Sequence, residues 1–211
     1  MSRGVDAGPA PPHAHELAPD EVIRVKVKAE LRKRLRGVRK TTPIEACAAR
    51  SEKIVASLAP HLEGASRIAL FWPILARHEV DLRPLDAVLR ARGATIAYPS
   101  VDPDTGEMVF RVVDEVSALE DAGYGFAEPS KDAPTMTELD AIVVPAVAVD
   151  PSGHRIGYGA GYYDRTLPRY APPAVTFAVA YDWQLIAEVP ATLTDVRVHW
   201  IVTDVRTFDA R

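Results

Sequence analysis

The sequence predicts an α/β fold: a three-layer sandwich with a mainly parallel sheet and helices on both faces. Short, continuous apolar segments alternate with segments of helical periodicity along most of the chain. Continuous apolar runs are typical of strands buried on both faces, and strand–helix alternation is typical of parallel sheets. The 211 residues suit one such domain. We expect it over residues 20–208, after a Pro-, Ala- and Gly-rich tail over residues 1–19 that should be disordered.

Two helices are predicted before the first strand. The first covers residues 20–40 and is densely basic. The second begins at the segment Thr42-Pro43-Ile44-Glu45 and runs to about residue 59. This segment has the form of a capping box, with Thr42 as the N-cap, Pro43 at the first helical position and Glu45 reaching back.

The remaining elements alternate in type. Five apolar segments are predicted to be buried strands, at residues 67–72, 94–101, 141–149, 175–181 and 198–202. A weakly alternating segment at 107–113 is predicted to be an edge strand. Three segments are predicted to be helical, at residues 82–92, 161–170 and 183–188. Asp81 should cap the first of these helices and Gly93 should end it. Residues 114–139 are expected to be irregular.

Composition and charge argue against several classes of protein. The formal net charge of −4 gives no overall attraction to nucleic acid or to anionic membranes. Cys47 is the only cysteine, which leaves no internal disulfide and no cysteine-based metal cluster. No apolar segment is long enough to span a bilayer, and the first residues lack the pattern of a signal peptide. We therefore expect a cytoplasmic protein without nucleic-acid or membrane partners.

The segment most informative about function follows the predicted strand at 141–149. In order, it contains Arg155, Gly157, Gly159, Gly161, Tyr162, Tyr163 and Asp164. Glycines let backbone N–H groups approach an anion closely, and the start of a helix adds partial positive charge. Ligands of such folds gather at the carboxyl ends of strands, so we expect nucleotide phosphates to bind here. Asp164 could hold a metal ion that bridges the phosphates.

Spacing alone leaves alternatives open for this loop. It is neither a Walker A loop nor a dinucleotide fingerprint, and a turn that only lets a helix pack close to a strand fits equally well. Asp164 could simply stabilise the helix dipole. The first helix has three interpretations: a solvated cationic face, a polyphosphate clamp formed by Lys28 and Arg32 four residues apart, or a nucleic-acid surface.

Two further acids have both a structural and a functional interpretation. Glu79 is either a solvated loop acid or an acceptor for a polar heterocycle, and Asp195 is either a turn residue or a metal ligand. The sequence contains no recognisable Ser-His-Asp order or Cys–His pair. The remaining inventory of cations, glycines and carboxylates favours phosphoryl transfer.

Together these residues resemble the 5-formyltetrahydrofolate cyclo-ligase (methenyltetrahydrofolate synthetase) family over about residues 26–204. The most specific segment is VVPAVAVDPSGHRIGYGAGYYDR. Three shorter segments also resemble family elements: KAELR at 28–32, GFAEP at 125–129 and AYDWQ at 180–184. The resemblance implies ATP- and Mg²⁺-dependent cyclisation of 5-formyltetrahydrofolate, with or without a polyglutamate tail, to 5,10-methenyltetrahydrofolate.

The resemblance also implies roles for individual residues. Lys28, Arg32 and Arg155 would contact the ATP phosphates, with Lys28 and Arg155 as the catalytic cations. The loop that wraps the phosphates would consist of Gly157, Tyr158, Gly159, Ala160, Gly161, Tyr162 and Tyr163, and its residues 158–162 would also face the folate. Glu79 would bind the pterin edge, and Trp72 would form an apolar wall of the folate pocket. Asp164 and Asp195 would hold Mg²⁺.

This chain departs from the family pattern near the second metal residue. Thr192 and Thr194 replace a glutamate and a histidine, and His199 stands where relatives often carry an aspartate. These changes keep open the hypothesis of a non-catalytic folate-binding paralogue. Two other hypotheses also remain: a nucleic-acid-binding protein that uses the basic helix, and another enzyme on a related fold that binds phosphate without turning over ATP.

Overall fold

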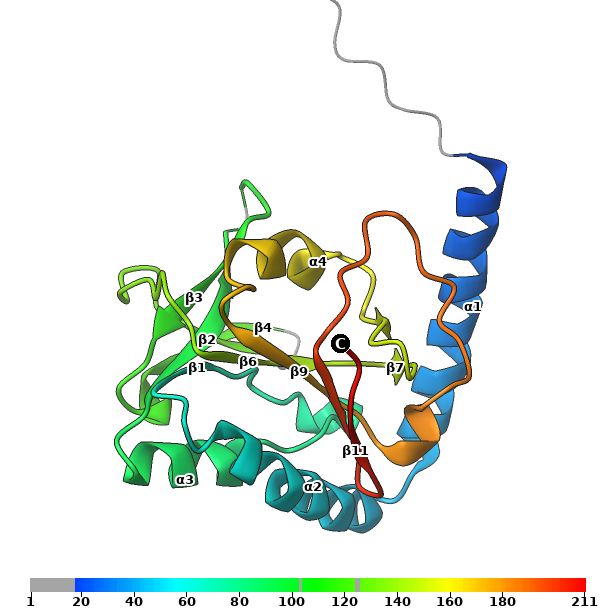
Figure 1. Cartoon of the computed structure of the whole chain (residues 1–211). Coiled ribbons are helices and arrows are strands. Elements are labelled where there is room, and N and C mark those ends of the chain that lie inside the picture. Colours follow the sequence, from blue (N-terminus) through cyan, green and yellow to red (C-terminus); the bar gives the residue numbers. More distant parts are fainter. Residues whose placement is uncertain (1–17, 103, 124–125) are drawn as a thin grey trace, which may run out of the picture.

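A computed structural model describes residues 18–102, 104–123 and 126–211. Its centre is a seven-stranded sheet in the order β11-β10-β9-β6-β1-β2-β3 (Figure 1). The strands are β1 (Arg67–Ala69), β2 (Thr95–Val101), β3 (Met108–Val112), β6 (Ala141–Pro145), β9 (Val175–Val179), β10 (Trp200–Val202) and β11 (Thr207–Asp209). The five inner strands are parallel, and β3 and β11 pair antiparallel at the two edges. The mainly parallel α/β fold is therefore confirmed.

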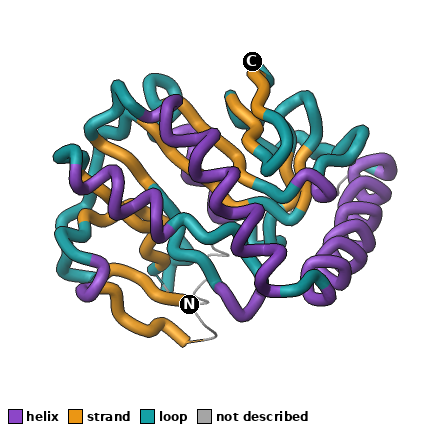
Figure 2. The backbone as a smooth tube through the Cα atoms, turned by 90° about the horizontal axis from the view of Figure 1, so that it is seen from below, coloured by secondary structure: helices purple, strands orange, loops and turns teal. Residues whose placement is uncertain are grey.

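Helices lie on both faces of this sheet. They are α1 (Pro19–Thr41), α2 (Ile44–Leu58), α3 (Arg83–Ala91) and the short α4 (Tyr162–Thr166). Figure 1 shows α2 and α3 below the sheet, α4 above it and α1 beside it. In the view of Figure 2 the helices of the lower face cross in front of the strands, and the long α1 stands apart at one side. Among the described residues, no helix combines the length and the hydropathy that a membrane span requires.

Side chains alternate between the two faces of each strand. In β6, Val143 packs in the core on the side of α2 and α3, and Ile142 and Val144 pack in the core on the side of α4. All three side chains are at most 1% exposed. A strand buried on both faces must be apolar at every position, and this explains the continuous runs in the sequence.

Short elements connect the larger ones. Two hairpins stand outside the main sheet: β4 (Leu119–Gly123) with β5 (Phe126–Pro129), and β7 (Ala148–Val149) with β8 (Arg155–Ile156). The described residues also contain five 3₁₀ turns: η1 (Ala59–Leu62), η2 (Leu75–Arg77), η3 (Val116–Ala118), η4 (Leu167–Arg169) and η5 (Asp182–Gln184).

Several predicted boundaries are wrong. The capping box does not form, because the Thr42 hydroxyl donates to the Val38 carbonyl at 3.0 Å and thereby ends α1, while Pro43 takes the N-cap position of α2. Asp81 accepts the backbone N–H of Arg83 at 3.0 Å, although Leu82 holds the N-cap position of α3. The strand expected at 141–149 is interrupted after β6, and the chain then enters the β7–β8 hairpin.

Four of the described strands are not predicted from the sequence at all: β4 and β5, which form a hairpin within residues 114–139, and also β8 and β11. The expected disorder falls mainly on residues 1–17, which lie outside the described residues, and α1 begins at Pro19. The extent of the single domain stays a prediction.

Candidate active site

Helix α1 lies against the β7–β8 hairpin through a small apolar cluster. Leu35 is buried there with Ala148 of β7, Ile156 of β8 and Val189, and Leu31 packs against the same group. This contact fixes which side of α1 faces the loops that follow the central strands. Residues spaced by four, which share one side of a helix, therefore point to those loops together.

Three cations on that side of α1 bind two separate loops. Arg24 donates to the Ala191 carbonyl at 3.0 Å, and Lys28 donates to the Asp195 carboxylate. One turn further, Arg32 Nε donates to the Gly157 carbonyl at 2.7 Å. The predicted pair of Lys28 and Arg32 is thus brought to both the glycine loop and the Asp195 loop.

The ion pair between Lys28 and Asp195 is mostly shielded from water. Each side chain is 11% exposed. The same carboxylate oxygen, Oδ2, also accepts the Thr192 backbone N–H at 2.7 Å. Thr192 contributes to the site through its backbone, a role that the side-chain pattern of the sequence could not reveal.

Arg155 is buried beside the start of α4. Its Nη2 donates to Asp164 Oδ1 at 3.0 Å, and its guanidinium carbon lies 5.4 Å from the centre of the Tyr163 ring. Its Nε is buried without a hydrogen-bond partner in the part of the chain that the structure describes. Burial raises the pKa of Tyr163 above its usual range, so this residue remains a neutral phenol.

Two glycines of the loop lie close to cations of the candidate site. A Cβ at Gly157 would lie 3.3 Å from Arg155 Nη1, so the loop backbone passes close to that guanidinium. Gly159 has a φ of +112°, which side chains rarely adopt, and a Cβ there would lie 3.4 Å from Arg32 Cζ. The loop is therefore shaped around two of the predicted phosphate-binding cations.

Cations crowd the side of α1 that carries Arg32. Burial and then the neighbouring charge of Arg36 lower the pKa of Arg32, while Asp195 opposes this shift. A group of like charges held together in this way favours an anionic ligand.

Glu79 lies under the glycine loop. Its Oε1 accepts the Tyr158 hydroxyl, and its Oε2 accepts the Ile74 backbone N–H at 2.8 Å. Arg39, which is 4% exposed, donates to the Tyr158 hydroxyl from the other side. Burial and then the charge of Glu79 raise the pKa of Tyr158 to about 12. The sequence did not single out Arg39, although it continues the stripe of cations along α1.

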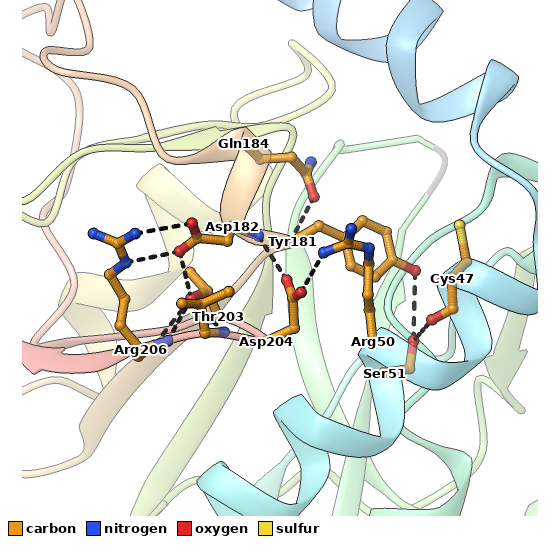
Figure 3. A network of polar contacts seen from close by, with 10 residues as sticks. Cys47, Arg50, Ser51, Tyr181, Asp182, Gln184, Thr203, Asp204 and Arg206 are labelled. Carbon is orange, nitrogen blue, oxygen red and sulfur yellow. Dashed lines mark hydrogen bonds and ion pairs between the residues drawn. The ribbon is translucent and has the colours of Figure 1, made fainter.

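A polar network joins α2 to the residues that follow β9 and β10 (Figure 3). The Tyr181 hydroxyl lies 3.4 Å from Ser51 Oγ, and it also donates to the Glu79 carbonyl at 3.1 Å. Gln184 Oε1 accepts the Tyr181 backbone N–H, and Asp204 links Arg50 to the backbone of the next residue, Asp182. The network reaches Glu79 at its backbone carbonyl and not at its carboxylate.

The remaining predicted residues lie in different surroundings. Trp72 packs against the main core and meets Tyr98 edge-on at 5.9 Å between ring centres. The Tyr162 ring faces the guanidinium of Arg165 at 5.4 Å. The same arginine donates to the carbonyl of Ala160, an exposed residue, at 2.9 Å, and a Cβ at Gly161 would lie 2.9 Å from its Nη1.

His199, the third departure from the family pattern, directly precedes β10, at the end of the sheet opposite to the candidate site. Its Nδ1 accepts the backbone N–H of Thr176 at 2.9 Å, near the start of β9. Burial and then the charge of Arg211 lower the pKa of His199, which favours the neutral ring that accepts this bond.

The donor set fits a magnesium ion that arrives with phosphates. Asp164 Oδ1 accepts the backbone N–H of Val196 at 3.2 Å, so this carboxylate lies beside the residue that follows Asp195. The described residues contain no group of three or more histidine, cysteine, aspartate or glutamate side chains placed to hold a metal. Mg²⁺ is commonly held by one or two carboxylates together with substrate phosphates, and these two aspartates could supply that number.

Comparisons with known proteins identify relatives of this chain. The chain is 46% identical over 88 residues to a 5-formyltetrahydrofolate cyclo-ligase of Mycolicibacterium smegmatis, an alignment that covers 40% of this chain and 45% of that protein. It is 28% identical over 158 residues to the Escherichia coli protein of the same name, covering 67% of this chain and 86% of the relative.

The fold also matches a solved structure. The NMR structure of a 5,10-methenyltetrahydrofolate synthetase from Aquifex aeolicus superposes with a TM-score of 0.76 at 31% identity, covering 88% of this chain and 93% of the other. The sequence profile described as the 5-formyltetrahydrofolate cyclo-ligase family matches residues 24–204. The chain therefore belongs to the 5-formyltetrahydrofolate cyclo-ligase family.

Proposed function

We propose that this protein is an ATP- and Mg²⁺-dependent ligase that closes 5-formyltetrahydrofolate to 5,10-methenyltetrahydrofolate with release of ADP and phosphate. One observation carries the proposal beyond family membership. Lys28 and Arg32 of α1 and Arg155 of β8 converge on one glycine loop and two carboxylates, although they are far apart in sequence. Cations, close backbone and carboxylates are the groups that phosphoryl transfer requires.

The chemistry follows from the weakness of the formyl group as an electrophile. The formyl oxygen attacks the γ-phosphorus of ATP, and the bond from that phosphorus to ADP breaks. N10 of the same folate then attacks the activated carbon, the carbon–oxygen bond breaks with departure of phosphate, and N10 gives up its proton to solvent. The ring closure is intramolecular, so orientation can supply effective molarities of about 10⁵–10⁸ M.

The protein's groups divide this work. Lys28, Arg32 and Arg155 hold and neutralise the phosphates, and the loop 157–163 supplies backbone N–H groups. Asp164 and Asp195 would hold Mg²⁺, which when bound adds positive charge at the phosphate oxygens. Glu79 accepts N–H groups from the pterin edge, and the loop residues 158–162 face the folate. Trp72 as a pocket wall stays a prediction.

Two observations weigh against the other hypotheses. Lys28 and Arg39 of the basic helix are at most 8% exposed and bond to groups of the site, which favours a polyanion bound in the site over nucleic acid as the ligand of these two cations. Thr192 supports Asp195 through its backbone N–H, a contact that does not depend on the side chain replaced there. This favours an intact site over a non-catalytic paralogue. A cytoplasmic location, and the absence of nucleic-acid and membrane partners, stay predictions.

The experiment is a spectroscopic assay of the purified protein with 5-formyltetrahydrofolate, ATP and Mg²⁺. The methenyl chromophore should form only when all three are present, with one ADP released for each ring closed. Folate binding without chromophore formation would instead identify the non-catalytic paralogue. Chromophore formation without ATP would contradict the phosphoryl-transfer route.

A further inference from the structure

Tyr158 covers the carboxylate that the proposed function assigns to the folate heterocycle. Its hydroxyl donates to Glu79 Oε1, and the Ile74 backbone N–H donates to Oε2. Glu79 is only 6% exposed, so a ligand can reach its carboxylate only if a covering group moves. Ile74 is itself buried at 3%, whereas Tyr158 stands on a loop between Gly157 and Gly159. Tyr158 is therefore the group that can withdraw.

The covering position of Tyr158 is held by several cations. Arg39 donates to the Tyr158 hydroxyl, and a hydroxyl that accepts from a cation is polarised as a donor. The guanidinium carbons of Arg36, Arg39 and Arg77 lie 5.4, 5.5 and 5.4 Å from the centre of the Tyr158 ring. Cations at this distance attract the face of an aromatic ring.

The backbone of Arg39 is fixed as well. Its carbonyl oxygen lies 2.9 Å from Nδ1 of His78, the residue next to Glu79, and His78 holds a left-handed φ of +53°. The residue that donates to Tyr158 is thus linked, through its backbone carbonyl, to the neighbour of the residue whose carboxylate accepts the Tyr158 hydroxyl.

We propose that Tyr158 is a gate on the folate pocket: its phenol occupies Glu79 and withdraws when a heterocycle edge that carries N–H donors binds there. Arg39 is the positioning residue that keeps the phenol in place. The inference rests on the proposed function, because it takes Glu79 as the folate-binding carboxylate. A ligand edge with two adjacent N–H donors would replace one phenol donor at Glu79, which makes the gate selective for such heterocycles.

The test is the affinity for 5-formyltetrahydrofolate of the full chain, measured by titration calorimetry without nucleotide. Tyr158→Phe keeps the ring and removes the hydroxyl that competes for Glu79. The apparent affinity of a site falls by the fraction of time that it is open. We expect the dissociation constant of the variant to be about tenfold lower than that of the parent, since a hydrogen bond to a charged group is lost from the closed state.

A matched control removes a neighbouring hydroxyl that also binds Glu79, but at its backbone carbonyl. Tyr181→Phe should leave the dissociation constant within about twofold of the parent, because the carboxylate keeps both donors. Arg39→Gln weakens the hold on the phenol and should also tighten folate binding severalfold. The Arg39→Gln variant tests the gate if Tyr158→Phe does not fold.

The outcomes separate the gate from the proposed function. Equal or weaker folate binding by Tyr158→Phe and Arg39→Gln, with the parent still binding and turning over folate, overturns the gate alone. A parent that binds no folate overturns the proposed function and the gate together. A Glu79→Gln variant that binds folate as the parent does overturns the assignment of Glu79 and with it the gate, but not the ligase activity.

Discussion

Breaking the shielded ion pair between Lys28 and Asp195 should be costly for stability. An exposed pair contributes about 0–1 kcal/mol, whereas removing one partner of a buried pair costs about 3–5 kcal/mol. Both side chains here are 11% exposed, which places the pair near the buried case. Thr192 still donates to Asp195 after the change Lys28→Met, so we expect the lower end, about 3 kcal/mol. Native domains are stable by only about 5–15 kcal/mol in total.

The double variant separates the pair from other effects of each change. Asp195→Asn alone should also cost about 3 kcal/mol, because it leaves the ammonium group without its partner. Lys28→Met combined with Asp195→Asn leaves no charge unpaired, and we expect a total loss of about 2–3 kcal/mol, well below the sum of the single losses.

Urea denaturation followed by circular dichroism measures all four proteins, with the unfolding slope as a check that compactness is unchanged. A double variant whose loss equals the sum of the two single losses within about 0.5 kcal/mol would refute the reasoning. In the folate assay, Lys28→Met should also raise the KM for ATP, since the same ammonium group is assigned to the phosphates.

Three further predictions address the proposed metal ligand Asp164, the glycine loop and the loss of stability at low pH. Asp164→Ala should abolish turnover in the chromophore assay; near-parental rates would remove this aspartate from the metal site. Gly159→Ala places a side chain at a φ of +112° and should lower the free energy of unfolding by about 1–3 kcal/mol and raise the KM for ATP, whereas unchanged values of both would contradict the loop geometry. Hydrogen bonds from the Arg67 side chain, and then from the backbones of Arg67 and Ser66, hold the pKa of Asp140 well below its usual range. A lowered pKa stabilises the folded state at every pH above the pKa of the same group in the unfolded chain, about 4 for aspartate. Urea titrations should therefore show that this contribution to the free energy of unfolding is lost as the pH falls below about 4. The Asp140→Asn variant should lose less of its free energy of unfolding over the same pH range.

The buried strands could be predicted because each has to be apolar on both faces. β6 and β9 follow directly from continuous apolar runs. The β4–β5 hairpin escaped prediction because it stands outside the main sheet, and the described side chains of β4 are mostly exposed. The capping box failed because a threonine hydroxyl can close the preceding helix as readily as it can open the next one.

The candidate site also contains residues that the sequence predicts and contacts that it does not. Lys28 and Arg32 could be paired from helical spacing, and Arg155 and Asp164 from their closeness to the glycines. The contacts of Tyr158 with Arg39 and with Glu79 join residues 119 and 79 positions apart, and no local sequence pattern encodes such contacts. Thr192 and Val196 act through backbone N–H groups, which every residue except proline possesses.

The balance of charge at the site has a consequence for the order of ligand entry. Lys28 neutralises Asp195 and Arg155 neutralises Asp164, so each proposed metal carboxylate already has a cation of the protein as its partner. A divalent ion without nucleotide would have to displace an ammonium or a guanidinium group from its carboxylate. A polyphosphate without a metal ion would meet two carboxylates that carry the same sign of charge and repel it. Magnesium and nucleotide entering as one complex can exchange partners with both pairs at once. We therefore expect the site to bind magnesium and nucleotide as one complex more readily than either ligand alone.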